Sequence, residues 1–503
     1  MPDYMFLLES RLSPEQRAAF ERVQELARQL QLNIYLTGGA VRDLISGQSI
    51  RDLDFTVEGN PVRMVRELEK GGARVIWESE KLRHHEIAFA GDADGSISAA
   101  RDDVYDSPGA KPDYRFAGIM EDLRRRDFSI NAIAISLNAQ SRGLLLDPTN
   151  GLADLERQEV RALSIHAFTN QPVRLLRALR YCARMGFKME SRTQEWFDLA
   201  MERGLDKNME DAEVGQELRA VSREENPVST LKEWESHGLL AAIHPQLQKR
   251  KPDYDSLNKM NRIRGNYMGI GLRPRLQFAV TNYVLGRLKD REAAAILRRM
   301  EFRKAEIEGA ANLLPEAQKI VKHLKGRKTN APRDAYSFLV SVPVETLVYI
   351  EVELPNPRVL SKIRNYVQKW RPLRMGLPTA ELDALGVARG PKFDKIIEQI
   401  FDMQLRGKAR TPELLTKALR NLAGIRDEVP KKPEKKKRGK GEPESAPAAA
   451  PANAPKSAPG KSVAVAPAPA KAAEKSPPAH KAAPPTPSHP KGKAQQTKGS
   501  RGR

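Results

Sequence analysis

The stretch that decides the fold begins Tyr35-Leu36-Thr37-Gly38-Gly39-Ala40-Val41-Arg42-Asp43. The apolar residues 33–36 predict a short strand, Gly38-Gly39 ends it, and residues 40–45 predict the start of a helix. Two glycines between a strand and a helix let backbone N–H groups approach an anion without a Cβ in the way. Arg42, one turn into the helix, is placed to reach the same anion.

The stretch continues, after a short turn, as Arg51-Asp52-Leu53-Asp54-Phe55-Thr56-Val57, which predicts a second strand over residues 53–57. Asp52 and Asp54 stand at i and i+2, so their side chains project from one face of a strand with Cα atoms roughly 6–7 Å apart. Carboxylates at that range suit a pair of Mg²⁺ ions ~3.5–4 Å apart, as used for in-line phosphoryl transfer. Each part alone also has an ordinary explanation, a tight turn for the glycines and a solvated strand end for the aspartates.

Joined in this order and spacing, the two parts resemble the head motif of the class II tRNA nucleotidyltransferase (CCA-adding enzyme) and bacterial poly(A) polymerase family. This family is a branch of the polymerase β-like nucleotidyltransferases. Its second glycine and its arginine contact the nucleotide triphosphate, and its two aspartates hold the catalytic metals. The resemblance therefore implies nucleotide contacts at Gly38, Gly39 and Arg42, and catalytic Mg²⁺ ligands at Asp52 and Asp54.

The composition of the 503 residues narrows the class of protein. One cysteine, Cys182, excludes an intramolecular disulfide and fits a reducing compartment. The first residues lack a basic segment followed by an apolar run, and no stretch approaches 18 uncharged apolar residues, so we expect no signal peptide, no membrane partner and a cytoplasmic location. The net charge of +21 indicates a polyanionic partner, most simply nucleic acid.

Part of this charge lies at the end of the chain. Residues 427–503 hold 17 Lys/Arg against 6 Asp/Glu, a net +11, and lack aromatic residues. Their Ala/Pro/Lys-rich composition predicts a disordered basic tail that holds RNA loosely through its phosphates. The predicted RNA contacts in this tail are Lys431, Lys432, Lys435, Lys436, Lys437 and Arg438. A passive solubilising tail is the alternative.

The first part of the chain mixes helix and strand patterns. Residues 1–30 and 61–70 have amphipathic helical spacing, whereas residues 75–77 and 87–89 alternate as strands do. Together with the first two strands they predict an α/β or α+β head built on one sheet.

Residues 91–118, rich in Asp, Gly and Pro, predict a loop. Within it, residues 101–105 are similar to an Arg-x-Glu-x-Tyr segment of the family. The family usually has a third metal-site acid just upstream, and the corresponding residue here is Ser96. Asp94 and Glu86 are the alternatives for that role.

Three arginines precede an apolar run in residues 124–134. The run predicts a helix, with Asp127 as its cap in the simplest structural interpretation. The run is also similar to the family's Arg-Arg-Asp-Phe-Thr-Ile-Asn-Ala signature, which implies nucleotide contacts at Arg126, Arg125 and Asn131.

Arg174, Arg177 and Arg180 recur every three residues and share one face of a predicted helix. A phosphate-binding or nucleic-acid-binding face and a solvated face are both compatible with this spacing. In the family the corresponding helix reads the incoming base with an Asp and an Arg one turn apart. The resemblance implies nucleotide contacts at Gln171, Arg174 and Arg177 and an RNA contact at Arg180, with Gln171 replacing the family's Asp.

We therefore expect four parts: a polymerase β-like nucleotidyltransferase head (1–138), an all-α neck (139–210), an all-α body (211–426) and a disordered tail (427–503). The implied function is Mg²⁺-dependent, template-independent transfer of CMP or AMP from CTP or ATP to the 3′ end of tRNA. A poly(A) polymerase acting on other RNA 3′ ends is one alternative. An RNA-binding relative with reduced catalysis, suggested by Ser96 and Gln171, is another. The sequence leaves the oligomeric state open.

Overall fold

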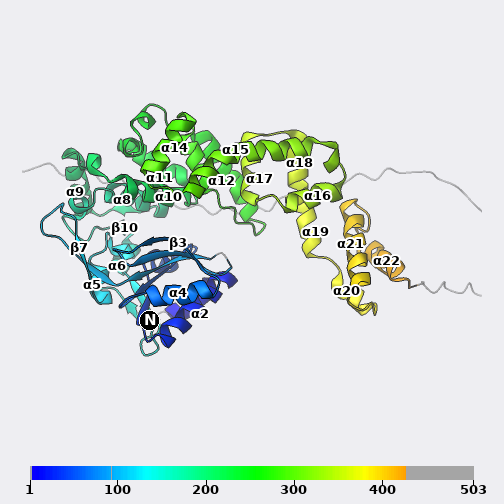
Figure 1. The fold of residues 1–503 in the computed structure, drawn as a ribbon, viewed down its shortest axis with the longest axis horizontal. Helices are drawn as coiled ribbons and strands as arrows, with labels where there is room; N and C mark the ends of the chain where they lie inside the picture. Colours follow the sequence, from blue (N-terminus) through cyan, green and yellow to red (C-terminus); the bar gives the residue numbers. More distant parts are fainter. Residues whose placement is uncertain (1–2, 92, 426–503) are drawn as a thin grey trace, which may run out of the picture. The chain divides into compact units, whose positions relative to one another are not determined.

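The structure is a computed structural model that describes residues 3–91 and 93–425 (Figure 1). The predicted tail over residues 427–503, with its basic cluster Lys431 to Arg438, lies outside the described residues. Among the described residues no single helix has the length and apolar character needed to cross a bilayer, although one sharply bent helix pair, Pro332–Val340 with Val344–Glu353, passes by length and composition.

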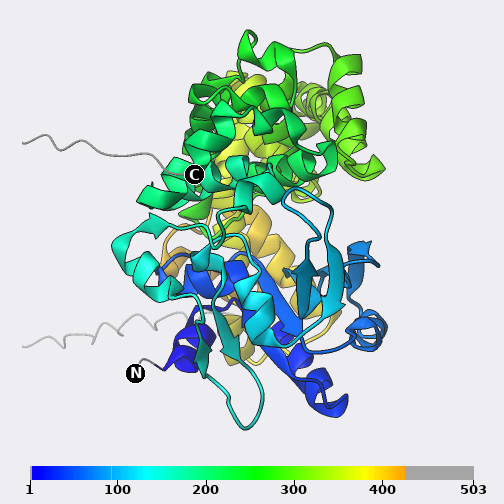
Figure 2. The ribbon, with the colours of Figure 1, turned by 90° about the vertical axis from the view of Figure 1, so that its left-hand side faces the viewer.

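A seven-stranded mixed sheet, here called the head sheet, organises the first third of the chain (Figures 1 and 2). Its strand order is β3-β4-β5-β2-β1-β8-β9, and only β2 and β5 are parallel neighbours. The strands are β1 Ile34–Thr37, β2 Leu53–Val57, β3 Arg74–Ser79, β4 His84–Ala88, β5 Asp94–Ala99, β8 Ala134–Ser136 and β9 Leu145–Leu146. The predicted second strand over residues 53–57 is confirmed. Strand β9 lies beyond residue 138, the predicted end of the head, and belongs to the same sheet.

Alternation along β2 separates a buried face from a functional face. Phe55 points into the core, where its ring lies 6.2 Å from that of Phe20 and 6.3 Å from that of Phe89. Helices α2 (Pro14–Gln29) and α4 (Val62–Lys70) pack together on this side with apolar faces matching their amphipathic spacing. Asp54 and Thr56 therefore project from the opposite face of the sheet.

The predicted loop over residues 91–118 is wrong, because this segment contributes three strands. They are β5, β6 (Arg101–Val104) and β7 (Asp113–Phe116). Strand β5 is made of small and polar residues with weak intrinsic strand preference, and its pairing with β2 determines its conformation. Gly95 lets the two strands meet, because a Cβ there would lie 2.3 Å from the carbonyl oxygen of Leu53.

The predicted helix after the three arginines is also wrong. Helix α5 (Ile119–Arg124) ends at the first arginine, and the apolar run forms the 3₁₀ turn η1 (Ser129–Asn131) and strand β8. The run is apolar because its side chains are buried, with Phe128, Ile130 and Ile133 each 0% exposed, and it leads directly into β8, which pairs with β1. Asp127 consequently caps no α-helix.

The rest of the described chain is mainly helical, as predicted. A two-stranded parallel pair, β10 (Glu159–Val160) with β11 (Lys188–Met189), interrupts the neck that was expected to be all-α. The remaining helices are α1 Tyr4–Arg11, α3 Gly38–Ile45, α6 Gly151–Arg157, α7 Ala167–Asn170, α8 Arg174–Met185, α9 Ser191–Glu202, α10 Asp211–Ser222, α11 Pro227–Ser236, α12 Tyr254–Met268, α13 Gln277–Leu285, α14 Asp290–Arg299, α15 Lys304–Lys325, α16 Pro332–Val340, α17 Val344–Glu353, α18 Pro357–Asn365, α19 Arg371–Met375, α20 Thr379–Ala384, α21 Pro391–Leu405 and α22 Pro412–Ala423.

Helix α8 joins the neck to the helices that follow it. The buried indole N–H of Trp234 on α11 donates a 2.9 Å hydrogen bond to the carbonyl of Leu176 on α8. The last three helices, α20 to α22, form a separate small hydrophobic core that includes Leu382, Ile400 and Leu419.

Candidate active site

Asp54 lies at the centre of the functional face of the head sheet. Ser96 on β5 stands directly opposite it in register, and the Ser96 hydroxyl donates a 2.8 Å hydrogen bond to Asp54 Oδ1. Burial raises the pKa of Asp54 to about 6, and the nearby negative charge of Asp52 acts in the same direction. Ser96, Arg126 and Arg42 oppose this shift without cancelling it. The two aspartates thus form a concentration of negative charge that its neighbours only partly neutralise.

The two glycines border this carboxylate. Gly38 starts α3 with a positive φ of 64°, which favours glycine, and Gly39 follows it in the first turn. A Cβ on Gly38 would lie 3.7 Å from Asp54 Oδ2, and a Cβ on Gly39 would lie 3.6 Å from the same atom. The glycines therefore keep open a space that is bounded by Asp54 and by the N-terminus of a helix, which is a favourable place for phosphate oxygens.

Arg126 bounds the same space and is held rigidly. Its Nε and Nη2 donate to Asp122, Nη2 also donates to Thr56, and Nη1 donates to the carbonyl of Asn131. These bonds use four of the five N–H groups of a guanidinium. The remaining N–H belongs to Nη1, the atom that would lie 3.3 Å from a Cβ on Gly38. Arg126 can therefore direct one donor into the space beside the glycines.

Asp122 holds Arg125 and Arg126, the two arginines that were predicted to contact the nucleotide, and it was not among the predicted site residues. It is 1% exposed, and its carboxylate pairs with Arg125 as well as with Arg126. Arg125 also bonds to Asp103 and to the carbonyl of Arg101, so it holds strand β6 instead of facing the glycines. The spacing of Asp122 to the two arginines, i+3 and i+4, is the signal in the sequence that indicates this pairing.

Arg42 is more enclosed than its predicted role suggests. Its side chain is 3% exposed, its Nε and Nη2 bond to Asp43, and its Nη1 donates a 2.7 Å hydrogen bond to Asn131 Oδ1. Nη2 would lie 3.6 Å from a Cβ on Gly39, so it still borders the open space. The Asn131 amide is used on both sides, because its Nδ2 donates to Asp127.

Arg177 and Arg180 belong to an internal chain of ion pairs, here called the arginine–acid chain. It runs from Asp127 to Arg177 (2.9 Å), to Glu217 on α10 (2.6 Å), to Arg180 (2.8 Å) and to Glu224 (3.3 Å). Burial alone would raise the pKa of Asp127, but Arg177 and then Arg174 outweigh burial and lower it to about 2. Arg180, which was predicted to contact RNA, faces the interior in this structure, because its guanidinium pairs with Glu217 and Glu224.

Arg174 differs from the other arginines of its helix. It is 7% exposed, and among the described residues its Nε has no hydrogen-bond partner and its guanidinium forms no ion pair. Burial lowers its pKa, with Asp127, Tyr105 and Asp103 opposing. Gln171 precedes α8, and its carbonyl accepts a 3.0 Å hydrogen bond from the Arg174 backbone N–H. A buried cation whose charge is only partly compensated is a strong candidate for a ligand contact.

The donors present fit Mg²⁺ held with a substrate. Within residues 3–91 and 93–425 no group of three or more His, Cys, Asp or Glu side chains is arranged to hold a metal. Mg²⁺ usually takes one or two carboxylates and completes its shell with water and substrate phosphates, which Asp52 and Asp54 can satisfy. Of the two alternatives for a third acid, Glu86 stands opposite Ser96 on β4, whereas Asp94 pairs with Arg275 at 3.6 Å.

Residues 34–161, which contain the glycines, the aspartates and Arg126, match the family of poly A polymerase head domains. Over these residues the chain is similar to poly A polymerase head domains. The matched residues run from β1 to β10 and so include the glycines, both aspartates, Ser96 and Arg126.

Sequence similarity to curated proteins extends beyond the head domain. An A-adding tRNA nucleotidyltransferase of Geobacter sulfurreducens is 25% identical over 389 residues, 76% of this chain and 44% of that protein. One from Halalkalibacterium halodurans is 33% identical over 238 residues, 46% of this chain and 54% of that protein. The chain thus spans about half or less of the length of these relatives. A structure described as the Thermotoga maritima CCA-adding enzyme complexed with tRNA_CCA matches 84% of this chain and 98% of its own, at 23% identity and a TM-score of 0.42.

Proposed function

We propose that this protein transfers CMP or AMP from CTP or ATP to the 3′ end of tRNA, without a template. The observation that carries the proposal is the convergence of Asp52 and Asp54 with the open space at Gly38-Gly39 and the free donor of Arg126. The similarity to A-adding and CC-adding tRNA nucleotidyltransferases and to multifunctional CCA proteins supports tRNA as the acceptor. We include a cytoplasmic location in the proposal.

In the proposed reaction, the RNA 3′ oxygen bonds to the α-phosphorus as the bond from that phosphorus to the bridging oxygen breaks and pyrophosphate leaves. Asp52 and Asp54 would hold Mg²⁺, which when bound activates the 3′ hydroxyl and neutralises charge on the leaving group. Ser96 orients Asp54 through its hydrogen bond to Oδ1. The α3 N-terminus at Gly38 and Gly39 would receive the triphosphate, with N–H donors from Arg126 and Arg42 at its border.

Arg174 and Gln171 would recognise the base in this proposal. Arg174 brings a buried guanidinium with an unused donor to the start of α8. The Gln171 amide offers one acceptor and two donors, which suit the amine and the ring nitrogen of cytosine or adenine. Arg177 would act through the arginine–acid chain that fixes α8, instead of touching the nucleotide.

The test is extension of defined tRNA ends. The full chain is incubated with Mg²⁺, one labelled nucleotide at a time, and tRNA that ends before the CCA, after the first C, or after the second C. We expect incorporation from CTP, from ATP or from both, and we expect extension to stop once the tRNA carries its complete CCA end. Long A tails would favour the poly(A) alternative. Lack of extension with all four nucleotides on every acceptor would contradict the proposal and favour an RNA-binding relative.

A further inference from the structure

The geometry of in-line transfer defines the side from which the acceptor must come. The open space for the triphosphate lies at Gly38-Gly39, at the end of β1 and on one side of Asp54. An attacking oxygen lies opposite the leaving oxygen across the α-phosphorus. Strand β5 is the neighbour of β2 on the side away from β1. The RNA 3′ hydroxyl must therefore approach over β5 and β4.

A polar row on the functional face marks this direction. Ser96 on β5 is paired in register with Asp54 on one side and with Glu86 on β4 on the other. Residues paired in register share a face, and two strand spacings put Glu86 roughly 10 Å from Asp54. The next charged group is Arg303, whose guanidinium donates a hydrogen bond to the carbonyl of Ile76 on β3. Glu306 raises the pKa of Arg303 most, and the nearby charge of Glu86 acts in the same direction.

A cavity of about 540 Å³ begins where this row ends. Its walls come from β3, from the ends of β4 and β5 at Ala88 and Asp94, and from the end of α10 and the starts of α13 and α15. Five arginines line it, namely Arg74, Arg219, Arg223, Arg275 and Arg303. The acids in its wall are Asp94 and Glu306, which leaves three positive charges in excess.

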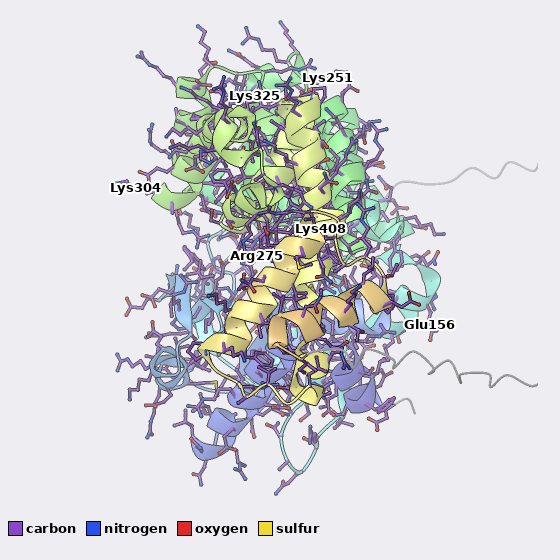
Figure 3. All side chains as sticks on the ribbon, turned by 90° about the vertical axis from the view of Figure 1, so that its right-hand side faces the viewer. Glu156, Lys251, Arg275, Lys304, Lys325 and Lys408 are labelled. Carbon is purple, nitrogen blue, oxygen red and sulfur yellow. The ribbon has the colours of Figure 1, made fainter. Side chains whose placement is uncertain are left out.

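The arginines divide into an inner and an outer set. Arg219 and Arg303 are half-buried, and Glu306 binds both of them, so they form a fixed base for the cavity. Arg74, Arg223 and Arg275 are exposed at its rim, and Arg275 is labelled in Figure 3. Phe302 supports the base, because Arg219 stacks 4.1 Å above its ring. A rim of exposed arginines above a fixed cationic base matches a run of phosphates better than a neutral ligand.

We infer that this arginine-lined cavity binds the backbone phosphates of the RNA acceptor strand next to its 3′ end, and so directs the 3′ hydroxyl over Ser96 toward Asp54. The inference rests on the proposed function and adds to it the path of the acceptor. The contacts are to phosphates, so they position the RNA without reading its sequence.

Arg223 gives the cleanest test, because its side chain is exposed and its backbone carbonyl, not its guanidinium, accepts a hydrogen bond from Arg51. Arg223→Glu is compared with Arg66→Glu, which makes the same charge change at an exposed position on α4, on the other face of the head sheet. The affinity for tRNA lacking its 3′ end is measured in EDTA without nucleotide, and steady-state kinetics are measured separately for RNA and for ATP or CTP.

We expect Arg223→Glu to weaken RNA binding and to raise the KM for RNA by roughly tenfold, since a bond to a charged group is lost and a repulsion is added. The KM for nucleotide and the kcat at saturating RNA should stay within about twofold. Arg74→Ala with Arg223→Ala should reduce the slope of log affinity against log salt by about 2, or ~1 for each phosphate contact. Arg66→Glu should resemble the unmodified chain.

Two failures are distinguishable. If the unmodified chain extends RNA but Arg223→Glu and the double variant match Arg66→Glu in RNA affinity and salt slope, the acceptor follows another path and this inference is overturned. If the unmodified chain extends no RNA with any nucleotide, the proposed function itself is wrong. A rise in the nucleotide KM as large as that in the RNA KM would also overturn the inference, because it would place Arg223 in the nucleotide site.

Discussion

Replacing Asp54 with Asn should make the protein more stable while it abolishes nucleotide transfer. The folded structure raises the pKa of Asp54 from 3.8 to about 6, mainly through burial and through the charge of Asp52. The ionised carboxylate therefore destabilises the folded state. A shift of about 2 units corresponds to ~3 kcal/mol at 1.36 kcal/mol per unit. Asn removes the charge, and its side-chain oxygen can still accept the hydrogen bond from Ser96.

The sign of the effect sets its pH dependence. Below pH 4 the carboxyl is protonated in both the folded and the unfolded states, so the variant should gain nothing from losing the charge. Between pH 4 and pH 6 the unfolded state ionises first, and the stability of the unmodified chain falls relative to the variant. Above pH 6 the difference should be constant, at ~3 kcal/mol in favour of Asp54→Asn.

The assay is urea denaturation of both proteins at pH 4, 5, 6 and 8, without Mg²⁺ or nucleotide. Asp113→Asn serves as the control, because Asp113 is an exposed carboxylate on β7 and its replacement should change stability by less than about 0.5 kcal/mol. If Asp54→Asn is no more stable than the unmodified chain at pH 8, the ionised Asp54 carboxylate does not destabilise the folded state. A gain of the same size at pH 4 and pH 8 would likewise mean that the charge is not its cause.

Three further predictions concern other parts of the chain. Removing residues 427–503, which carry a net +11, should leave nucleotide transfer intact but weaken RNA binding and reduce the salt dependence of the RNA affinity. A truncated chain that no longer unfolds cooperatively on heating would contradict this prediction. Glu217→Ala leaves two buried guanidinium groups without their shared partner and should therefore lower the free energy of unfolding by ~3–5 kcal/mol. A loss below about 1 kcal/mol in urea denaturation would mean that the arginine–acid chain is not a structural unit. Gln171→Asp adds an anion near Arg174 and should therefore increase the preference for CTP and ATP over UTP and GTP. Unchanged selectivity in kinetics measured with each nucleotide separately would exclude Gln171 from base recognition.

The sequence predicted the parts of the head that depend on local pattern. Strand β2 has the predicted bounds, because its alternation and its flanking turn are both local signals. Strand β5 was missed, because its small polar residues form a strand only through parallel pairing with β2, about forty residues away in the chain. The apolar run that ends at Ala134 was predicted as a helix, but it forms the turn η1 and leads into β8, because a buried segment has the same apolar composition whether or not it is helical.

The candidate site was predictable in its members but not in its pairings. The motif identified the glycines, Asp54 and Arg126, which lie together in the structure, and Asp52, whose charge helps to raise the pKa of Asp54. The spacing of Arg177 and Arg180 correctly placed them on one helix face, but it gave no information about Glu217, which lies about forty residues later and buries them. A charged helix face has the same pattern whether water, RNA or a buried acid covers it.

In the proposed function, Asp52 and Asp54 form the catalytic pair for nucleotide transfer. The most direct measurement is the single-turnover rate of labelled nucleotide incorporation by the unmodified chain, by Asp52→Ala and by Asp54→Ala, with RNA affinity measured on the same preparations. We expect both variants to lose incorporation and to keep the RNA affinity of the unmodified chain. Either variant keeping a tenth or more of the unmodified rate would contradict it, because the catalytic metals would then have to be held elsewhere.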